Sequence, residues 1–356
     1  MEDTGAGMRN SILRTGLDAL YFSGSHCLMR PFVGGVGAIL TLRHVRPARR
    51  EGFQPNRFRE VTPQFLENLI KRLRRAGLEL IGLDDLYCYL LENDFRRRFV
   101  CLTFDGGYRD TLRFAYPILR KHQVPFALFI PTSFPDRIGE LWWFVVETVI
   151  ANNDRIGLVI DEEDRRFECG SLEQKRDVFQ AVDGWLRALP SDRMLRRVVR
   201  DLASRYDVDR TALCRDLCMT WAELTELAAD PLVTIGAHSV NHVALRMLDG
   251  DGARSEMRMS RSVIAAALGK TPEHFSYPMG DAASAGPREF AIARELGFKT
   301  AVTARPGVLF REHREYLTAL PRIALSGELQ ELRYVQVLLS GAATAIYNGF
   351  RRVDAA

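Results

Sequence analysis

The chain has 356 residues, of which 47% are hydrophobic and 26% are charged, and its formal net charge is +4. This composition is sufficient for a large buried core and excludes a disordered or fibrous protein. Because the net charge is small and the basic residues are spread among acids, we expect no nucleic-acid partner. The densest basic groups, 71–75 and 96–98, fall on an expected helix face and just before an expected strand, where solvated charge is the usual explanation.

Six cysteines are scattered along the chain without a CxxC pair, which is typical of a reducing compartment. The N-terminus contains Glu2 and Asp3 instead of the basic and then apolar pattern of a signal peptide. The apolar run 32–42 is too short to span a bilayer. We therefore expect a cytoplasmic protein without a signal peptide or transmembrane helix. An amphipathic helix over 12–32 would allow contact with a membrane surface or another subunit, and the sequence leaves the oligomeric state open.

From residue 36 onward, strand-like and helix-like segments alternate. The first strand is expected over 36–42, just before His44. A helix follows, with Thr62 as N-cap, Pro63 as its first residue and Gly77 as its stop. Strands are then expected at 78–81, 99–104 and 126–130, separated by a helix that Asp84 caps and a helix over 110–122. Such alternation predicts a parallel sheet or barrel.

Between residues 136 and 224 the alternation stops. This stretch contains helix-like segments at 142–150, 172–189 and 193–206, and only 158–160 is strand-like. Alternation then resumes, with segments at 233–235, 253–268, 275–277, 287–296 and 299–302. We expect an N-terminal helical segment (1–35), a first barrel part (36–135), a mainly helical insertion (136–224), a second barrel part (225–330) and a C-terminal helical tail (331–356).

Two motifs stand where expected strands end. Thr103-Phe104-Asp105-Gly106-Gly107 places an acid at the exit of one strand, and His238-Ser239-Val240-Asn241-His242 places two imidazoles after another. Reactive groups of a barrel gather at the carboxyl ends of its strands, and two neutral imidazoles with nearby acids are typical of hydrolytic metal chemistry. Taken alone, an Asp at the position of Asp105 is more often a helix cap or a solvated loop residue. Taken alone, His238 and His242 could equally be two surface imidazoles.

A third motif, Ser276-Tyr277-Pro278-Met279-Gly280, completes an ordered set. With it the chain resembles the polysaccharide deacetylase family, carbohydrate esterase family four, which includes the nodulation-type chitooligosaccharide deacetylases. Further segments, at 141–143, 303–307 and 320–323, resemble a bacterial subgroup with a helical insertion. The resemblance implies an α/β fold, a distorted (β/α) barrel in which we expect seven strands, and metal-assisted removal of an acetyl group from an amino sugar.

The resemblance also implies roles for individual residues. His238 and His242 match the ligands of a divalent metal, with zinc as the expected ion, and Asp105 matches the general base that takes a proton from metal-bound water. Met279 occupies the position whose backbone N–H would stabilise the oxyanion. Substrate and oxyanion contacts are expected from Tyr277, Pro278, Met279, Gly280 and Arg322.

Two positions depart from the family pattern. Gly106 stands where the family has a second, metal-binding Asp, so Asp110, Asp281 or water would have to replace that ligand. Ser276 stands where many members carry an Arg that orients the base, so we expect Asp105 to be less firmly held.

Either His313 or His44 could donate the proton to the leaving amine, because the unperturbed pKa of imidazole, about 6.5, suits proton transfer near neutral pH.

The leading hypothesis is a hydrolase that removes acetyl groups from an acetylated glycan or a lipid-linked sugar. The alternatives are a catalytically impaired glycan-binding protein on the same fold and a hydrolase of another non-peptide C–N bond. Residues 142–144 could form a sugar-stacking rim, although core packing is the preferred interpretation, and Arg305 and Arg322 are expected to be structural or substrate-contacting.

Overall fold

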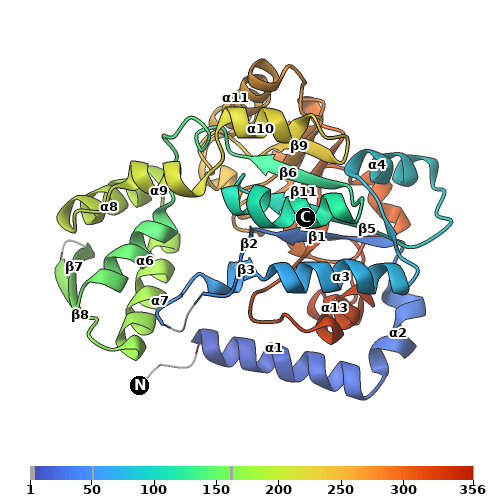
Figure 1. Cartoon of the computed structure of the whole chain (residues 1–356), viewed down its shortest axis with the longest axis horizontal. Coiled ribbons are helices and arrows are strands. Elements are labelled where there is room, and N and C mark those ends of the chain that lie inside the picture. Colours follow the sequence, from blue (N-terminus) through green and yellow to red (C-terminus); the bar gives the residue numbers. More distant parts are fainter. Residues whose placement is uncertain (1–4, 50–51, 161–162, 356) are drawn as a thin grey trace.

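The computed structural model describes residues 5–49, 52–160 and 163–355, so Glu2 and Asp3 lie outside the described residues. At its centre the described chain forms a closed barrel of parallel strands in the order β1-β12-β11-β10-β9-β6-β5, and the pairing of β1 with β5 closes it. The short strand β4 joins the start of β5. The predicted seven-stranded (β/α) barrel is thereby confirmed (Figure 1).

The barrel strands are short and nearly fully buried, as expected of parallel strands covered by helices. They are β1 (Gly37–Leu42), β5 (Phe99–Asp105), β6 (Phe126–Ile130), β9 (Val233–Ala237), β10 (His274–Ser276), β11 (Thr300–Pro306) and β12 (Leu320–Ala324). Outside the barrel, β2 (His44–Val45) pairs with β3 (Glu60–Val61), and β4 covers Glu79–Leu80.

The helices that cover the barrel begin largely where local signals predict. They are α3 (Pro63–Arg75), α4 (Leu83–Glu92), α5 (Tyr116–Lys121), α10 (Trp221–Ala228), α11 (Gly250–Leu268) and α12 (Pro287–Glu295). At α3 the prediction is confirmed, because the Thr62 hydroxyl accepts a hydrogen bond from the Phe65 N–H at 3.2 Å. The predicted cap of α4 is wrong: Gly82 is the N-cap, and the Asp84 carboxylate instead pairs with His274 and Lys299.

The helix predicted over 110–122 starts differently from the expectation. A π-helical turn over Thr111–Ala115 precedes α5. This wider turn directly follows the loop that carries Asp105.

The stretch between β6 and α10 forms a body with its own hydrophobic core beside the barrel (Figure 1). It consists of α6 (Trp142–Asn152), β7 (Arg155–Ile160), β8 (Glu163–Glu168), α7 (Leu172–Ala188), α8 (Asp192–Arg205) and α9 (Arg210–Leu217). The strand-like signal at 158–160 belongs to an antiparallel hairpin of β7 and β8. The expected boundary at residue 224 falls inside α10, which covers the barrel strand β9.

Helices from the two ends of the chain pack together. These are α1 (Gly5–Phe22), α2 (Ser25–Val33), α13 (Leu332–Leu339) and α14 (Ala342–Tyr347). Leu17 of α1 is buried against Tyr334 and Val337 of α13, and α1 runs along the underside of the barrel in Figure 1. In the described ranges, no helix combines the length and apolar character needed to cross a bilayer.

Candidate active site

The residues of the three motifs meet at the carboxyl end of the barrel. Asp105 is the last residue of β5, His238 directly follows β9, and Ser276 is the last residue of β10. Because these strands are parallel, their ends open at the same edge. The polar contacts described next are the direct consequence of this arrangement.

Asp105 is clamped by a guanidinium from β12. Arg322 Nη1 and Nη2 donate to Asp105 Oδ1 and Oδ2 at 2.8 and 2.7 Å, and the Arg322 side chain is only 1% exposed. The remaining N–H groups of Arg322 bond to the Thr303 carbonyl oxygen, the Thr103 hydroxyl and the Ser276 hydroxyl. This two-pronged geometry is the strongest form of carboxylate recognition available to a side chain.

Ser276 completes the clamp instead of loosening it. Its hydroxyl donates to Asp105 Oδ1 at 3.1 Å while accepting from Arg322 Nη2 at 3.0 Å. Arg322 therefore supplies the guanidinium that the family resemblance places at position 276. The expected weak hold on Asp105 is not observed.

These contacts determine the charge of Asp105. Burial by itself would raise the pKa of this carboxyl, but the positive charge and hydrogen bonds of Arg322, with a further contribution from Arg43, outweigh burial. The pKa of Asp105 consequently lies well below its usual range. Asp105 is an anion at every physiological pH.

His238 is fixed as a neutral imidazole. Its Nδ1–H donates to the Ser276 carbonyl oxygen at 2.6 Å, which leaves Nε2 with a free lone pair. Burial lowers the pKa of His238 to about 4, against a partial opposing effect from Asp105. The ring is 1% exposed, so its position is set by the surrounding packing.

His242 lies beside it, with the two ring centroids 5.0 Å apart. Its own ring packs against Phe134 and Trp143, at centroid distances of 5.9 and 5.2 Å. Burial, followed by the proximity of His238, lowers the pKa of His242 well below normal. Its Nδ1 is buried without a hydrogen-bond partner in the described part of the chain.

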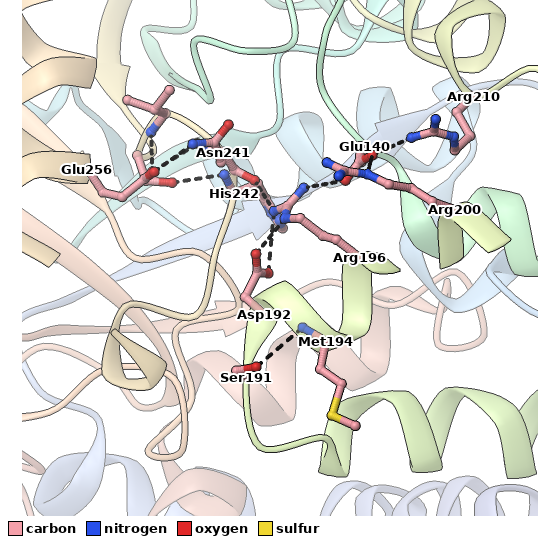
Figure 2. Close-up of polar contacts among 12 residues, drawn as sticks. Glu140, Ser191, Asp192, Met194, Arg196, Arg200, Arg210, Asn241, His242 and Glu256 are labelled. Atoms are coloured by element: carbon pink, nitrogen blue, oxygen red, sulfur yellow. Dashed lines mark hydrogen bonds and ion pairs between the residues drawn. The ribbon is translucent and has the colours of Figure 1, made fainter. Parts of the chain in front are cut away.

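The loop between the two imidazoles is held from both sides (Figure 2). Glu256 of α11 accepts hydrogen bonds from the backbone N–H groups of Val240 and Asn241, at 2.9 Å each, and from the Asn241 side chain at 2.6 Å. From the insertion, Arg196 of α8 donates to the Asn241 carbonyl oxygen at 2.8 Å. The insertion therefore helps to position the second motif.

Arg196 is itself anchored within the insertion. Asp192 and Glu140 accept from its guanidinium, and Glu140 also pairs with Arg200 and Arg210 (Figure 2). A network of this kind keeps a long side chain in one orientation. The hydrogen bond from Arg196 to Asn241 thus ties the loop carrying His242 to the insertion.

A cavity of about 290 Å³ opens in front of these residues. Three parts of the chain line it: the strand ends and their loops with Asp105, Gly106, Tyr108, His242, Met279 and Asp281; the insertion with Trp142, Trp143, Asp183 and Arg187; and the segment after β1 with Arg43, Phe58 and Arg59. Trp142 and Trp143 are nearly buried, at 5% and 3% exposure. They belong both to the insertion core and to the cavity wall.

The donor set does not fit the predicted zinc site. Within residues 5–49, 52–160 and 163–355, no group of three His, Cys, Asp or Glu side chains is placed to hold a metal ion. His238 and His242 would supply two neutral ligands, whereas a catalytic zinc ion normally has three protein ligands. Moreover, Arg43 and Arg59 add positive charge next to His242, which disfavours a further cation.

Gly106 cannot simply be exchanged for the missing acid. Its φ angle is +106°, and a Cβ atom there would lie 2.5 Å from Tyr108 Cε2. Tyr108 is itself packed, with its ring centroid 4.0 Å from that of His44. The tyrosine ring occupies the space that a ligand side chain at position 106 would need.

The two candidate replacements for that acid differ in position. Asp110 Oδ2 contacts His44 Nδ1 at 2.7 Å and does not line the cavity. Asp281 does line it, with Oδ1 accepting from the Ser284 N–H and hydroxyl at 2.9 and 2.7 Å. Of the two, the structure brings only Asp281 to the cavity.

Neither candidate proton donor lines the cavity. His44 is 1% exposed and lies against Tyr108 and Phe144. His313 lies near the opposite end of the barrel, since Leu309 pairs with Gly37, the first residue of β1. Its Nδ1 accepts from the Phe310 N–H at 3.0 Å, which is a structural contact. The position of His313 does not support the predicted role.

The third motif contributes backbone more than side chains. Tyr277 is buried, and its hydroxyl donates to the Thr318 carbonyl oxygen at 2.8 Å. Met279 lines the cavity with φ at +59°, and Pro278 and Gly280 form the tight turn around it. No group of the described residues accepts a hydrogen bond from the Met279 N–H, so this donor is available to a ligand.

Part of the chain that carries the site is similar to a known protein family. The family model described as polysaccharide deacetylase matches residues 196–301. This segment is similar to the polysaccharide deacetylase family. The match contains His238, His242 and the third motif, and it confirms the predicted resemblance. Asp105 precedes the matched segment, and the barrel brings it to the same strand ends as the matched motifs.

Solved structures of other proteins share the barrel fold over most of this chain. The Streptococcus pyogenes deacetylase PplD, solved with acetate, has 16% identity and a TM-score of 0.55, covering 85% of this chain and 97% of its own. IcaB from Ammonifex degensii has 15% identity and a TM-score of 0.52 (86% and 97%). A de-N-acetylase from Aggregatibacter actinomycetemcomitans has 13% identity and a TM-score of 0.55 (85% and 99%). No curated protein matches the chain by sequence.

Several site residues escape local sequence patterns. From the sequence, Arg322 is expected only as a structural or substrate contact, Tyr108 only ends the first motif, and Arg43 and Arg59 belong to no motif. Arg43 directly follows a predicted strand end, which is the one signal that could have identified it. The others depend on contacts between distant segments.

Proposed function

We propose that this protein hydrolyses acetyl groups on amino sugars of a glycan. The observation that carries the proposal is the convergence of an ionised Asp105 with the neutral imidazoles of His238 and His242 at the carboxyl end of the barrel, where Asp105 and His242 line one cavity. Tryptophan rings in the cavity wall suit the apolar faces of sugar rings.

In this proposal Asp105 accepts the proton of the attacking water. Arg322 keeps the carboxylate ionised and oriented, and general-base catalysis of this kind contributes typically about 10² to 10⁴ in rate. Because its pKa is low, Asp105 is a weak base, and we place its contribution at the lower end of that range. The unpaired Met279 N–H is the donor that would stabilise the oxyanion.

Metal dependence and zinc remain predictions from the family resemblance. The resemblance assigns the ion to His238 and His242. The described residues do not complete such a site. Elemental analysis of protein purified without chelator decides this question: near-stoichiometric zinc would require ligands beyond the described donor set.

The test of the function is acetate release from a panel of acetylated polysaccharides and oligosaccharides. Asp105→Asn is expected to reduce release about 100-fold, and His238→Ala to reduce it strongly, while both variants keep the parent's circular dichroism spectrum. Equal release by parent and variants would contradict the proposal. Release of a small acid other than acetate would point instead to hydrolysis of a different C–N bond.

A second candidate, glycan binding without turnover, is favoured by one observation. Position 106 lacks the acid of the family pattern, and Tyr108 fills the adjoining space. In that case the parent protein would retain acetylated glycans on an affinity matrix and release no acetate from any of them.

A lipid-linked substrate and peripheral membrane contact also belong to the proposal. Large apolar side chains on the contacting helices α1, α2 and α14 are exposed, with Phe22 at 72%, Phe32 at 73% and Tyr347 at 75%. Exposed Arg30 and Arg351 lie on the same helices or directly after them. Aromatic tips with guanidinium groups suit an anionic lipid surface. Flotation with phosphatidylglycerol vesicles, lost in a Phe22→Ser/Phe32→Ser variant, would test this contact.

A further inference from the structure

Two guanidinium groups face the cavity without a hydrogen-bond acceptor. Arg43 and Arg59 both line it, and neither donates a hydrogen bond to any residue in the described ranges of the chain. Arg59 Nε is buried and unpaired. A guanidinium carries five donors and normally finds acceptors for them when it is withdrawn from water.

Arg43 is placed by the barrel itself. It follows β1, whose last residue Leu42 lies opposite Phe104 in the parallel register with β5. Arg43 therefore emerges beside Asp105, and its charge contributes to the low pKa of that carboxyl. A group bound to Arg43 lies close to the proposed reaction centre.

Arg59 is held by stacking. Its guanidinium carbon lies 5.4 Å from the ring centroid of Trp143 and 5.0 Å from that of Phe58. Next to it in the chain, Glu60 pairs with Arg46 and Arg49, and Arg49 reaches Glu147 of the insertion. Stacking on aromatic faces leaves the N–H edge of a guanidinium free for a ligand. The Arg59 guanidinium is therefore already oriented before a ligand binds.

The other charges of the cavity wall are mostly neutralised within the protein. Arg187 pairs with Asp183 at 2.7 Å, and Asp105 pairs with Arg322. Only Asp281 lacks a cationic partner among the described residues. Arg43 and Arg59 thus leave the cavity with an excess of positive charge. A guanidinium is not deprotonated in proteins, so both are cations at neutral pH, although burial lowers the pKa of Arg43 below its usual value and that of Arg59 to about 9.

We propose that Arg43 and Arg59 bind an anionic oxygen group of the substrate, a carboxylate or a phosphate. The substrate class is then an acidic acetylated glycan, in which a charged group sits near the acetamide that is cleaved. The guanidinium fork matches either anion with paired N–H···O bonds. This inference rests on the proposed function for its substrate class, whereas the anion site itself does not depend on turnover.

The anion site is tested directly with inorganic phosphate. Calorimetric titration of the full-length protein is expected to show binding that weakens about 10- to 100-fold in Arg59→Gln, as for a lost charge-assisted contact. Arg59→Lys should fall between the two, because it keeps the charge and loses the fork. Arg97→Gln, a change at an exposed arginine before β5, serves as the matched control. Binding equal in parent and Arg59→Gln would overturn the proposal.

The substrate class is tested with paired glycans. Acetylated acidic oligosaccharides are compared with the same oligosaccharides after carboxyl reduction, and phosphorylated ones with their dephosphorylated forms. We expect kcat/KM to fall at least about tenfold when the preferred anion is removed, and this difference to disappear in Arg59→Gln. The pair that responds identifies carboxylate or phosphate as the recognised group.

The outcomes separate the two proposals. Equal kcat/KM for charged and neutral partners would leave the deacetylase function intact and overturn the anion inference. No acetate from any glycan, together with phosphate binding that depends on Arg59, would overturn the function and retain the anion site. Melting temperatures of the variants within a few degrees of the parent establish that they are folded.

Discussion

Arg322 on β12 and Asp105 at the end of β5 form a two-pronged ion pair although 217 positions separate them in the chain. The pair joins the two strands that flank β1, and both side chains are almost fully buried. It explains how the Asp105 carboxylate can be oriented although position 276 is a serine.

Removing the guanidinium should damage both stability and activity. In Arg322→Met the buried Asp105 carboxylate loses its counter-charge, so we expect the free energy of unfolding to fall by about 3 to 5 kcal/mol. Urea denaturation measures this loss. The double variant Asp105→Leu/Arg322→Met should recover much of it, because no buried charge then remains unpaired. A double variant as unstable as the single one would mean that Arg322 acts through packing alone.

Restoring the acid of the family pattern should fail. Gly106→Asp must place a side chain at a φ of +106° and 2.5 Å from the Tyr108 ring, a strain of about 1 to 3 kcal/mol. We expect lower melting temperatures for Gly106→Ala and Gly106→Asp alike, and no gain in bound zinc by elemental analysis. A stable Gly106→Asp protein with stoichiometric zinc would show that the ring moves aside and that the family-type site can be rebuilt.

The Glu256 clamp on the second motif should matter for catalysis. Glu256→Ala removes the acceptor of three hydrogen bonds from Val240 and Asn241, which should reduce acetate release about tenfold or more through misplacement of His242. Glu256→Gln keeps one carbonyl acceptor and should retain more activity. Glu295→Ala breaks only the pair of Glu295 with Arg254 and should change nothing measurable.

Stability should decrease on acidification through the buried histidines. His238 and His313 have pKa values of about 4 in the fold, against about 6.5 in an unfolded chain. Between these values the unfolded state binds more protons, so the free energy of unfolding falls by about 1.4 kcal/mol per pH unit for each histidine. In His313→Gln, the dependence of the free energy of unfolding on pH should be smaller by about 1.4 kcal/mol per pH unit, the contribution of one histidine. An unchanged slope would mean that His313 is not kept neutral by the fold.

Local signals predicted much of the scaffold. The Thr62 cap and Pro63 start of α3 depend on neighbouring residues alone, and the strand ends at Asp105 and before His238 follow from short apolar runs. The cap of α4 failed for a physical reason. Asp85, one residue later, accepts from the Gly82 N–H, so Asp84 is free to pair elsewhere.

Local sequence signals do not predict which charged residues meet at the site. Arg322 reaches Asp105 only because β12 and β5 lie on either side of β1. Arg43 and Arg59 stand in an arginine-rich stretch where nothing in the sequence distinguishes cavity residues from solvated ones. Barrel closure determines which charged side chains lie opposite one another, and the periodicity of hydrophobic residues in the sequence does not predict this.

The cavity wall has two origins, and this has a consequence for how the protein can diversify. The strand ends present Asp105 and His242, whereas Trp142, Trp143, Asp183 and Arg187 come from a body with its own core. Under the proposed function, replacement of that body would change which glycan is admitted while the strand ends stay as they are. The same body also contacts the second motif through Arg196, so a replacement that keeps this loop in place needs a donor to the Asn241 carbonyl oxygen.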